Sequence, residues 1–366
     1  MNELPKVKRI RSLVILFIIL MSVSGLSAKE YPSFYRGVRP LGMGGAFTAV
    51  ADDENALYYN PAGLSEISTL QLGILNPLVE ASENTMDMIN DAQDTDFDDT
   101  AETVEFLRDY VGEHEHARAA LAPYVGFNLF GFGAMVGGIA QATIDLEVRN
   151  PVWPEAHVDM VADRGLLGGF GAKLPLTGLR AGASLKIISR DSLEEVYTAT
   201  DIASDDFENQ FEDDQKSGSG VALDLGAIYS MPFVSVVDLD VGLSVQNVPS
   251  MNMGDAKDMD TQANLGFAVK KQFLKFSLLG AVDYVDLGNS YDEDNDFGKR
   301  LHMGVEFQLP MILSVRAGLN QGYYTLGATV DVWVFRFDVA TYAEEVGAYA
   351  GQREDRRYVG QITIGW

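Results

Sequence analysis

Two closely spaced histidines are the side chains of this sequence best suited to bind a metal ion. His114 and His116 lie near several carboxylates, and imidazoles joined by a carboxylate are a common zinc ligand set. The acidic surroundings also fit a second interpretation, in which both histidines are solvated residues of a loop. We favour the second interpretation, so the sequence predicts no metal site and no cofactor.

Three alternating carboxylates match the start of a calcium-binding loop: Asp292, Asp294 and Asp296. The glycine that such a loop needs falls one position late, at Gly298, and the twelfth position is Met303 rather than Glu. The segment is therefore not an EF-hand. Loose binding of a divalent cation at the surface stays open.

Charged side chains recur at alternate positions within otherwise apolar segments. In a membrane protein, such charges must pair or stay hydrated. They would either line a polar path or fill a narrow interior with ion pairs. No combination of Ser, His and an acid has a recognisable context, so we do not expect an enzyme. The candidates for the interior are Arg180, Lys186, Asp224, Glu306, Arg316 and Arg336.

The elements that would position these charges are strands of a transmembrane β-barrel. From Tyr358 to Trp366 the side chains alternate in character at every step. Successive strand side chains face opposite sides, so one face suits lipid, and closing the sheet satisfies every backbone donor and acceptor. The terminal aromatic residue, Trp366, is our candidate signal for the barrel-assembly machinery.

Upstream segments repeat this alternation. Tight turns join some of them and long acidic segments join others, which is the asymmetry of an outer-membrane barrel with turns in the periplasm and loops outside. The sequence thus predicts an all-β fold, an antiparallel barrel of about 14 strands. The clearest strand candidates are Leu179 to Ile188, Val221 to Ser230, Leu239 to Gln246, Leu301 to Leu309, Met311 to Asn320 and Trp333 to Val339.

The chain is strongly acidic, with a formal net charge of −26, and has no cysteine. These properties argue against nucleic acid as a partner and exclude disulfides and thiol chemistry. The acidic residues gather in segments that we interpret as solvated loops: Asp87 to Glu115, Asp191 to Asp214, Asp255 to Asp260, Asp283 to Asp296 and Glu344 to Asp355.

The domain organisation follows from the two ends of the alternating region. Residues 1–28 have a basic start, a short apolar run and small residues before Ala28, as in a cleavable signal peptide. Residues 29–66 lack membrane alternation and form our predicted N-terminal hatch, and residues 67–366 form the barrel. Within the first outer loop, residues 85–111 have helical spacing, although a disordered acidic loop is the alternative.

The predicted hatch contains a motif rich in small residues. Its glycines permit positive φ and close approach of the backbone, and Asn followed by Pro favours a turn. Such a compact segment would plug the barrel lumen. The motif residues are Gly42, Gly44, Gly45, Asn60, Pro61, Ala62 and Gly63.

This motif resembles the N-terminal hatch of the FadL/TodX family of outer-membrane transporters, in which an Asn, Pro, Ala sequence precedes the first strand. The segments 41–51 and 58–64 are closer still to the divergent PorV-like, TraF-like and spirochaetal branches of that family. The resemblance implies passive uptake of a hydrophobic small molecule, such as a fatty acid or hydrocarbon, across the outer membrane of a diderm bacterium.

The resemblance also implies a lateral exit through a kink in the third strand, and adjacent glycines at Gly137 and Gly138 are the candidates for it. Glycine that relieves crowding inside the barrel is the alternative. A different function also stays open, namely a PorV-like scaffold that binds secreted or surface proteins through its acidic loops. Membrane lipid is a partner in either case.

Overall fold

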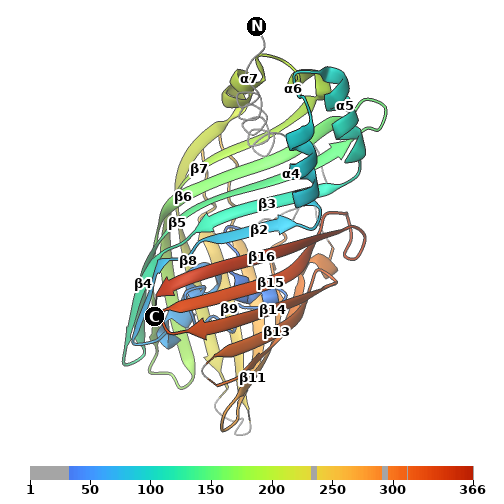
Figure 1. Cartoon of the computed structure of the whole chain (residues 1–366). Helices are drawn as coiled ribbons and strands as arrows, with labels where there is room; N and C mark the ends of the chain where they lie inside the picture. The colour runs from blue at the N-terminus through green and yellow to red at the C-terminus, as the bar shows by residue number, and fades with distance from the viewer. Residues whose placement is uncertain (1–32, 232–236, 291–295, 311, 366) are drawn as a thin grey trace.

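The computed structural model describes residues 33–231, 237–290, 296–310 and 312–365, which form one antiparallel sheet closed into a barrel (Figure 1). Closure is complete because β5 pairs with β6 while β1 and β2 both pair with β16. The strand segments are β1 Leu70–Leu75, β2 Leu78–Ser82, β3 His114–Leu121, β4 Tyr124–Leu129, β5 Phe132–Arg149, β6 Glu155–Lys173, β7 Leu179–Thr198, β8 Lys216–Ser230, β9 Asp238–Val248, β10 Gln262–Gln272, β11 Ser277–Tyr284, β12 Leu301–Gln308, β13 Leu313–Asn320, β14 Tyr323–Val332, β15 Phe335–Glu345 and β16 Glu354–Gly365.

The described helices are short and lie before or between the strands. None of them has the length and apolar character needed to cross a bilayer. They are α2 Val38–Gly42, α3 Ala56–Tyr59, the 3₁₀ helix η1 Pro61–Glu66, α4 Thr85–Asp94, α5 Thr100–Asp109, α6 Ala199–Ile202, α7 Phe207–Asp214 and the 3₁₀ helix η2 Gly298–Arg300.

The sheet contains sixteen strand segments but fourteen strands, because each of the first two strands is broken once. Segments β1 and β2 share the partner β16, and β3 and β4 share β5. The breaks fall at Pro77 and Pro123, since proline has no N–H to donate to the ladder. The Asn76 side chain bridges them, accepting from Ala122 N at 2.8 Å and donating to Ala122 O at 2.6 Å. The predicted strand number is confirmed.

The lipid-facing and lumen-facing sides follow the predicted alternation. On β12, for example, Val305 is half exposed while Glu306 beside it is buried in the lumen. Short turns gather at one end of the barrel, and the long connections that carry α4 to α7 gather at the other (Figure 1). We call these the turn end and the loop end.

Strands β5, β6 and β7 have 18, 19 and 20 residues, whereas a tilted strand needs about 9–11 to span a bilayer. Their outer halves therefore stand clear of the membrane at the loop end. There α4 to α7 pack on the outer face of the sheet. Ile144, Leu146 and Val148 contribute to this contact, and they lie on the same outward face of β5 as Val136. This outer subdomain has its own apolar core, and residues 85–111 contain two helices where the sequence predicted one insert.

The outer subdomain gives a first prediction. Leu107 on α5 is completely buried in its core, so Leu107→Ala is expected to destabilise it by about 2–5 kcal/mol through a cavity. Protease cleavage within residues 85–111 would then accelerate, while the barrel keeps its heat-modifiable migration on a gel. Met86→Ala, at a side chain 65% exposed on α4, is the control. Equal cleavage rates for the two variants would show that this core does not form.

Several predicted features lie outside the described residues, namely the signal peptide at 1–28, Trp366, Asp292 and Asp294. Some predicted solvated residues are buried instead. Glu115, Asp283, Glu344 and Asp355 are each no more than 4% exposed. Asp283, Glu344 and Asp355 lie at strand ends and point into the barrel, whereas Glu115 faces the outer subdomain, where Thr85 Oγ1 donates to it at 2.7 Å. The loops are therefore shorter than the acidic segments that we had interpreted as loops.

Candidate functional site

The N-terminal segment, residues 33–66, lies within the barrel. Helix α2 contacts β14 and β15, while η1 contacts β6, β7 and β8 on the opposite side. Its apolar residues join the inward residues of many strands in one buried cluster, and Figure 1 shows the blue segment among the strands. The segment therefore fills the cross-section that an empty barrel would leave open.

Inward glycines of the strands make room for this segment. A Cβ built on Gly304 would lie 2.3 Å from Met43 O, and one on Gly318 would lie 2.7 Å from Gly44 N. On the other side of the lumen, a Cβ on Gly182 would lie 2.3 Å from Pro61 O. At these places backbone packs directly against backbone, which any side chain would prevent.

The motif glycines lie at the same close contacts. Gly44 and Gly45 have φ of +65° and +86°, a region that other residues rarely adopt. A Cβ on Gly42 would lie 3.0 Å from Gly327 Cα, and one on Gly63 would lie 1.6 Å from Ala51 O. Each of these four positions therefore requires glycine, either for its backbone conformation or for a close contact.

Asn60 holds two parts of the segment together. Its Oδ1 accepts from Ala62 N at 3.1 Å and caps η1, in which Pro61 occupies the first turn. Its Nδ2 donates to Thr48 O at 2.8 Å. The side chain is fully buried, so replacement by an apolar residue would leave these backbone groups without partners.

Asp283 on β11 fixes the middle of the segment. Its Oδ2 accepts from Phe47 N at 2.8 Å and Thr48 N at 2.7 Å. Nearby, Nδ1 of His302 lies 2.8 Å from Gly44 O. These roles were not predictable from the sequence, because each contact joins residues more than 230 positions apart. Asp283 had instead been predicted to lie in an acidic loop.

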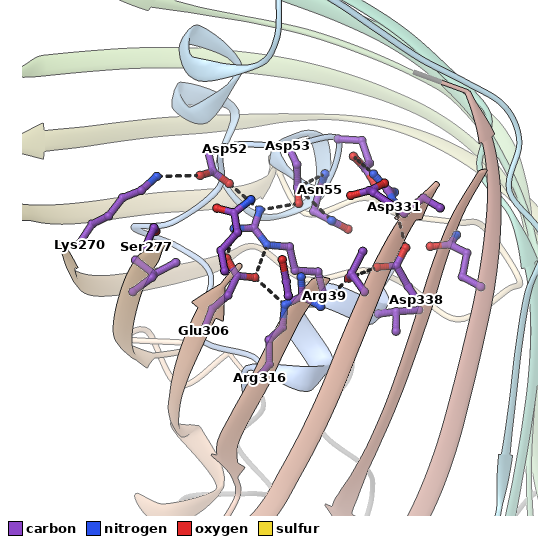
Figure 2. Close-up of a pocket in the computed structure, with 18 residues that line it drawn as sticks. Arg39, Asp52, Asp53, Asn55, Lys270, Ser277, Glu306, Arg316, Asp331 and Asp338 are labelled. Carbon is purple, nitrogen blue, oxygen red and sulfur yellow. Dashed lines mark hydrogen bonds and ion pairs between the residues drawn. The ribbon is translucent and has the colours of Figure 1, made fainter. Parts of the chain in front are cut away.

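A charged pocket lies on the turn-end side of the segment. At its centre Arg39 pairs with Asp52 at 2.6 Å, with Asp53 at 2.8 Å and, through two bonds of 2.8 Å, with Glu306 (Figure 2). Arg316 also binds Glu306, at 2.5 Å. These pairs tie the N-terminal segment to the barrel wall.

Other charges of the pocket complete this network. Arg336 binds Glu54 of the segment and Asp338 of the wall, the latter at 2.9 Å. Burial, with Glu54 adding to it, raises the pKa of Asp53 above its ordinary value, and Arg39 opposes that rise. Carboxylates outnumber cations around the pocket, which gives it an acidic character.

The remaining predicted lumen charges also form pairs. Arg180 binds Asp240 at 2.8 Å, and Lys186 binds Asp224 at 2.9 Å and Asn247 at 2.6 Å. All six candidates face the lumen and are paired, which favours ion-pair packing over an open polar path. The sequence alone had left both interpretations open.

The two histidines are not solvated, so that prediction is wrong. His114 lies 3.1 Å from Asp355, and His116 is 1% exposed, 2.7 Å from Asp145 and 3.0 Å from Glu80. They lie on β3, whose alternation continues into the acidic segment and turns both side chains inward. Among the described residues, no group of three or more His, Asp or Glu side chains is arranged so that it could hold a metal ion.

An aromatic pocket lies on the loop-end side of the segment. The segment contributes the rings of Phe34, Tyr35, Tyr58 and Tyr59, and the barrel wall contributes mainly polar residues. The sequence did not predict these aromatic residues as part of a pocket, since they follow no strand or helix period. The adjacent Tyr58 and Tyr59 in an otherwise small-residue segment were the available signal.

The bulge that the family resemblance implied as one alternative for Gly137 and Gly138 is absent. Pairing of β5 with β6 runs through Gly137 and Gly138 without a register shift. The irregularity lies in the two strands before β5, at the breaks beside Pro77 and Pro123. Gly138 N donates to Pro123 O at 2.9 Å, so the glycines border the break rather than create one.

Comparison with known proteins shows which families and structures this chain resembles. A family model described as F plasmid transfer operon, TraF, protein matches residues 166–331. No curated protein matches the chain in sequence. Among solved structures, the chain is similar to the CymD monoaromatic hydrocarbon channel, with a TM-score of 0.51 and 11% identity over 90% of this chain and 96% of that chain.

Two further structures show lower similarity. The toluene transporter TodX of Pseudomonas putida has a TM-score of 0.48 and 12% identity, covering 93% of this chain and 98% of that chain. A FadL homologue of Pseudomonas aeruginosa has a TM-score of 0.38 and 11% identity, covering 92% and 99%. The similarity to the CymD channel confirms the predicted type of barrel at the level of the fold.

Proposed function

We propose that this protein is an outer-membrane channel for passive uptake of hydrophobic small molecules past an N-terminal hatch formed by residues 29–66. The observation that carries the proposal is the aromatic pocket at the loop end, built half from the hatch and half from the wall. A ligand entering from the loop end would reach aromatic surface before it met the charged network. The CymD channel, with the same type of barrel, is named for monoaromatic hydrocarbons.

In this mechanism the hatch separates two compartments of different chemistry. The aromatic pocket faces the outer loops, and the charged pocket faces the turns. Passage requires the hatch to shift, which means breaking some contacts of Arg39 or Asp283. A hydrophobic ligand gains from aromatic contact but not from the ion pairs, so the turn-end compartment would favour its release.

A lateral exit into the membrane also remains part of the proposal. The adjacent breaks beside Pro77 and Pro123 have fewer ladder hydrogen bonds than the surrounding wall, and Asn76 closes them. Gly137 and Gly138 border this place on β5. The wall is weakest here, so this is where a ligand would leave sideways.

A second function has an observation of its own in favour. The outer subdomain stands above the membrane-spanning part, and its short helices carry a high proportion of Asp and Glu. Such a surface would suit a scaffold that binds secreted or surface proteins. The pairing of all six lumen charges is also compatible with a barrel that transports nothing.

A search for co-purifying ligand tests the proposal. Mild detergent extraction of the wild type should retain a lipid or hydrocarbon detectable by mass spectrometry. A variant with Asn60→Ala and Pro61→Ala should retain several-fold less, because the η1 cap and the contact with Thr48 are lost. Absence of ligand from both proteins, together with a stable protein partner, would favour the scaffold.

A further inference from the structure

The aromatic pocket has two walls of different chemistry. On the hatch side, Phe34 and Tyr59 are only partly buried, although they pack against a buried cluster. The Phe34 ring packs against Tyr58, with centroids 6.3 Å apart, and the Tyr59 ring packs edge-on against Phe47, with centroids 5.4 Å apart. The rings thus offer a firm apolar surface to whatever occupies the pocket.

The barrel wall of the same pocket carries carboxamides. Gln246 on β9 and Gln262 on β10 are directly opposite in the register, and Asn264 follows on the same face of β10. Gln262 and Asn264 are 8% and 6% exposed. Leaving three neighbouring, largely buried carboxamides without water or another hydrogen-bond partner costs free energy.

These amides have unused hydrogen-bonding capacity. The side chain of Gln262 has no hydrogen-bond partner in the described part of the chain, and Asn264 uses only its Oδ1, which accepts from Asp286 N at 2.9 Å. Gln246 uses only its Nε2, which donates to Tyr58 O at 2.7 Å and Tyr59 O at 3.2 Å. None of the free amide atoms is sealed from solvent, so they are available to a ligand.

The ionisable groups of the pocket are either engaged or sealed from solvent. Arg36 pairs with Glu344, and His302 contacts Gly44 O. Asp283 accepts two backbone amides through Oδ2, while its Oδ1 has no partner but is buried away from solvent. The free capacity that a ligand can reach is neutral, which points to a neutral ligand.

A pure hydrocarbon would make favourable contacts with the aromatic wall of the pocket but not with the carboxamide wall. It would displace water from the carboxamides without replacing the lost hydrogen bonds, which costs affinity. A ring that carries a hydroxyl would pack on Phe34 and Tyr59 and exchange hydrogen bonds with Gln262 and its neighbours.

We infer that the aromatic pocket binds hydroxylated monoaromatic compounds of the phenol class in preference to unsubstituted hydrocarbons. This inference rests on the proposed uptake function and specifies its substrate. Gln262 is the main determinant of specificity, since its whole carboxamide is free.

Isothermal titration of the purified full chain with p-cresol and with toluene tests this inference, because the two compounds differ only by one hydroxyl. We expect p-cresol to bind about five- to tenfold more tightly, as one well-formed neutral hydrogen bond provides. Gln262→Met keeps the approximate volume but removes the amide, so it should abolish the preference and leave toluene binding unchanged or improved. Gln308→Met, in the charged pocket, is the matched control and should change neither affinity.

The outcomes separate the inference from the function on which it rests. Toluene binding as tightly as p-cresol would overturn the inference and leave the uptake function standing. An undiminished preference in a folded Gln262→Met protein would overturn the role of Gln262. Failure of both compounds to bind the wild type would overturn the inference and count against uptake itself. The comparison on the wild type is decisive even if the variant does not fold.

Discussion

Arg39→Met is expected to open the barrel to ions. The Arg39 side chain is the centre of a network with three carboxylates, and removing one partner of a buried ion pair costs about 3–5 kcal/mol because the other charges are left uncompensated. This cost falls on the docked hatch, since Glu306 keeps Arg316 in the wall while Asp52 and Asp53 of the hatch lose their main cation. Conductance in planar bilayers should rise by an order of magnitude or more above the wild type.

The control for this experiment is Lys270→Met in the same pocket. Lys270 reaches only Asp52, at 3.6 Å, and its side chain is 42% exposed, so its removal should cost at most about 1 kcal/mol. Conductance of this variant should stay near the wild-type level. If both variants conduct alike, the ion pairs do not hold the hatch in place.

Gly304→Leu is expected to displace the hatch while the barrel remains closed. Its Cβ would lie 2.3 Å from Met43 O, a backbone atom that cannot move without the rest of the segment. The β12 ladder would be retained, because the new side chain points into the lumen. Protease cleavage within residues 33–66 should accelerate at least tenfold, with heat-modifiable migration unchanged.

Gly280→Ala on the neighbouring strand β11 provides the comparison. Its Cβ would meet nothing closer than 4.0 Å, so the added methyl group is tolerated. Cleavage of residues 33–66 in this variant should match the wild type. A resistant hatch in Gly304→Leu would mean that the segment does not pack on β12 as described.

The barrel was predictable because lipid and lumen impose a period of two on every strand. From Val221 to Ser230, for example, the alternation locates β8 without any tertiary information. The breaks at Pro77 and Pro123 were not predicted, since the sequence does not reveal that two prolines far apart in the chain become neighbours. Their effect depends on the register between the first two strands.

The sequence predicted which charged residues face the lumen but not which of them form ion pairs with each other. Arg316 and Glu306 could be assigned inward from alternation, but their link to Arg39 joins residues 267 positions apart. Asp283 and His116 were misassigned because acidic neighbours in sequence suggested loops, whereas the strands continue through those positions. The aromatic pocket was missed because half of it comes from a segment without periodicity.

Site-directed labelling tests most directly whether the hatch divides the lumen into two compartments. The chain has no cysteine, so single-cysteine variants report without background. Gln262→Cys lies in the aromatic pocket and Gln308→Cys in the charged pocket, on opposite sides of the hatch. A small, charged thiol reagent applied to intact cells should modify position 262 and leave position 308 unmodified until the membrane is disrupted. Rapid modification of position 308 in intact cells would contradict a closed hatch and with it the central claim.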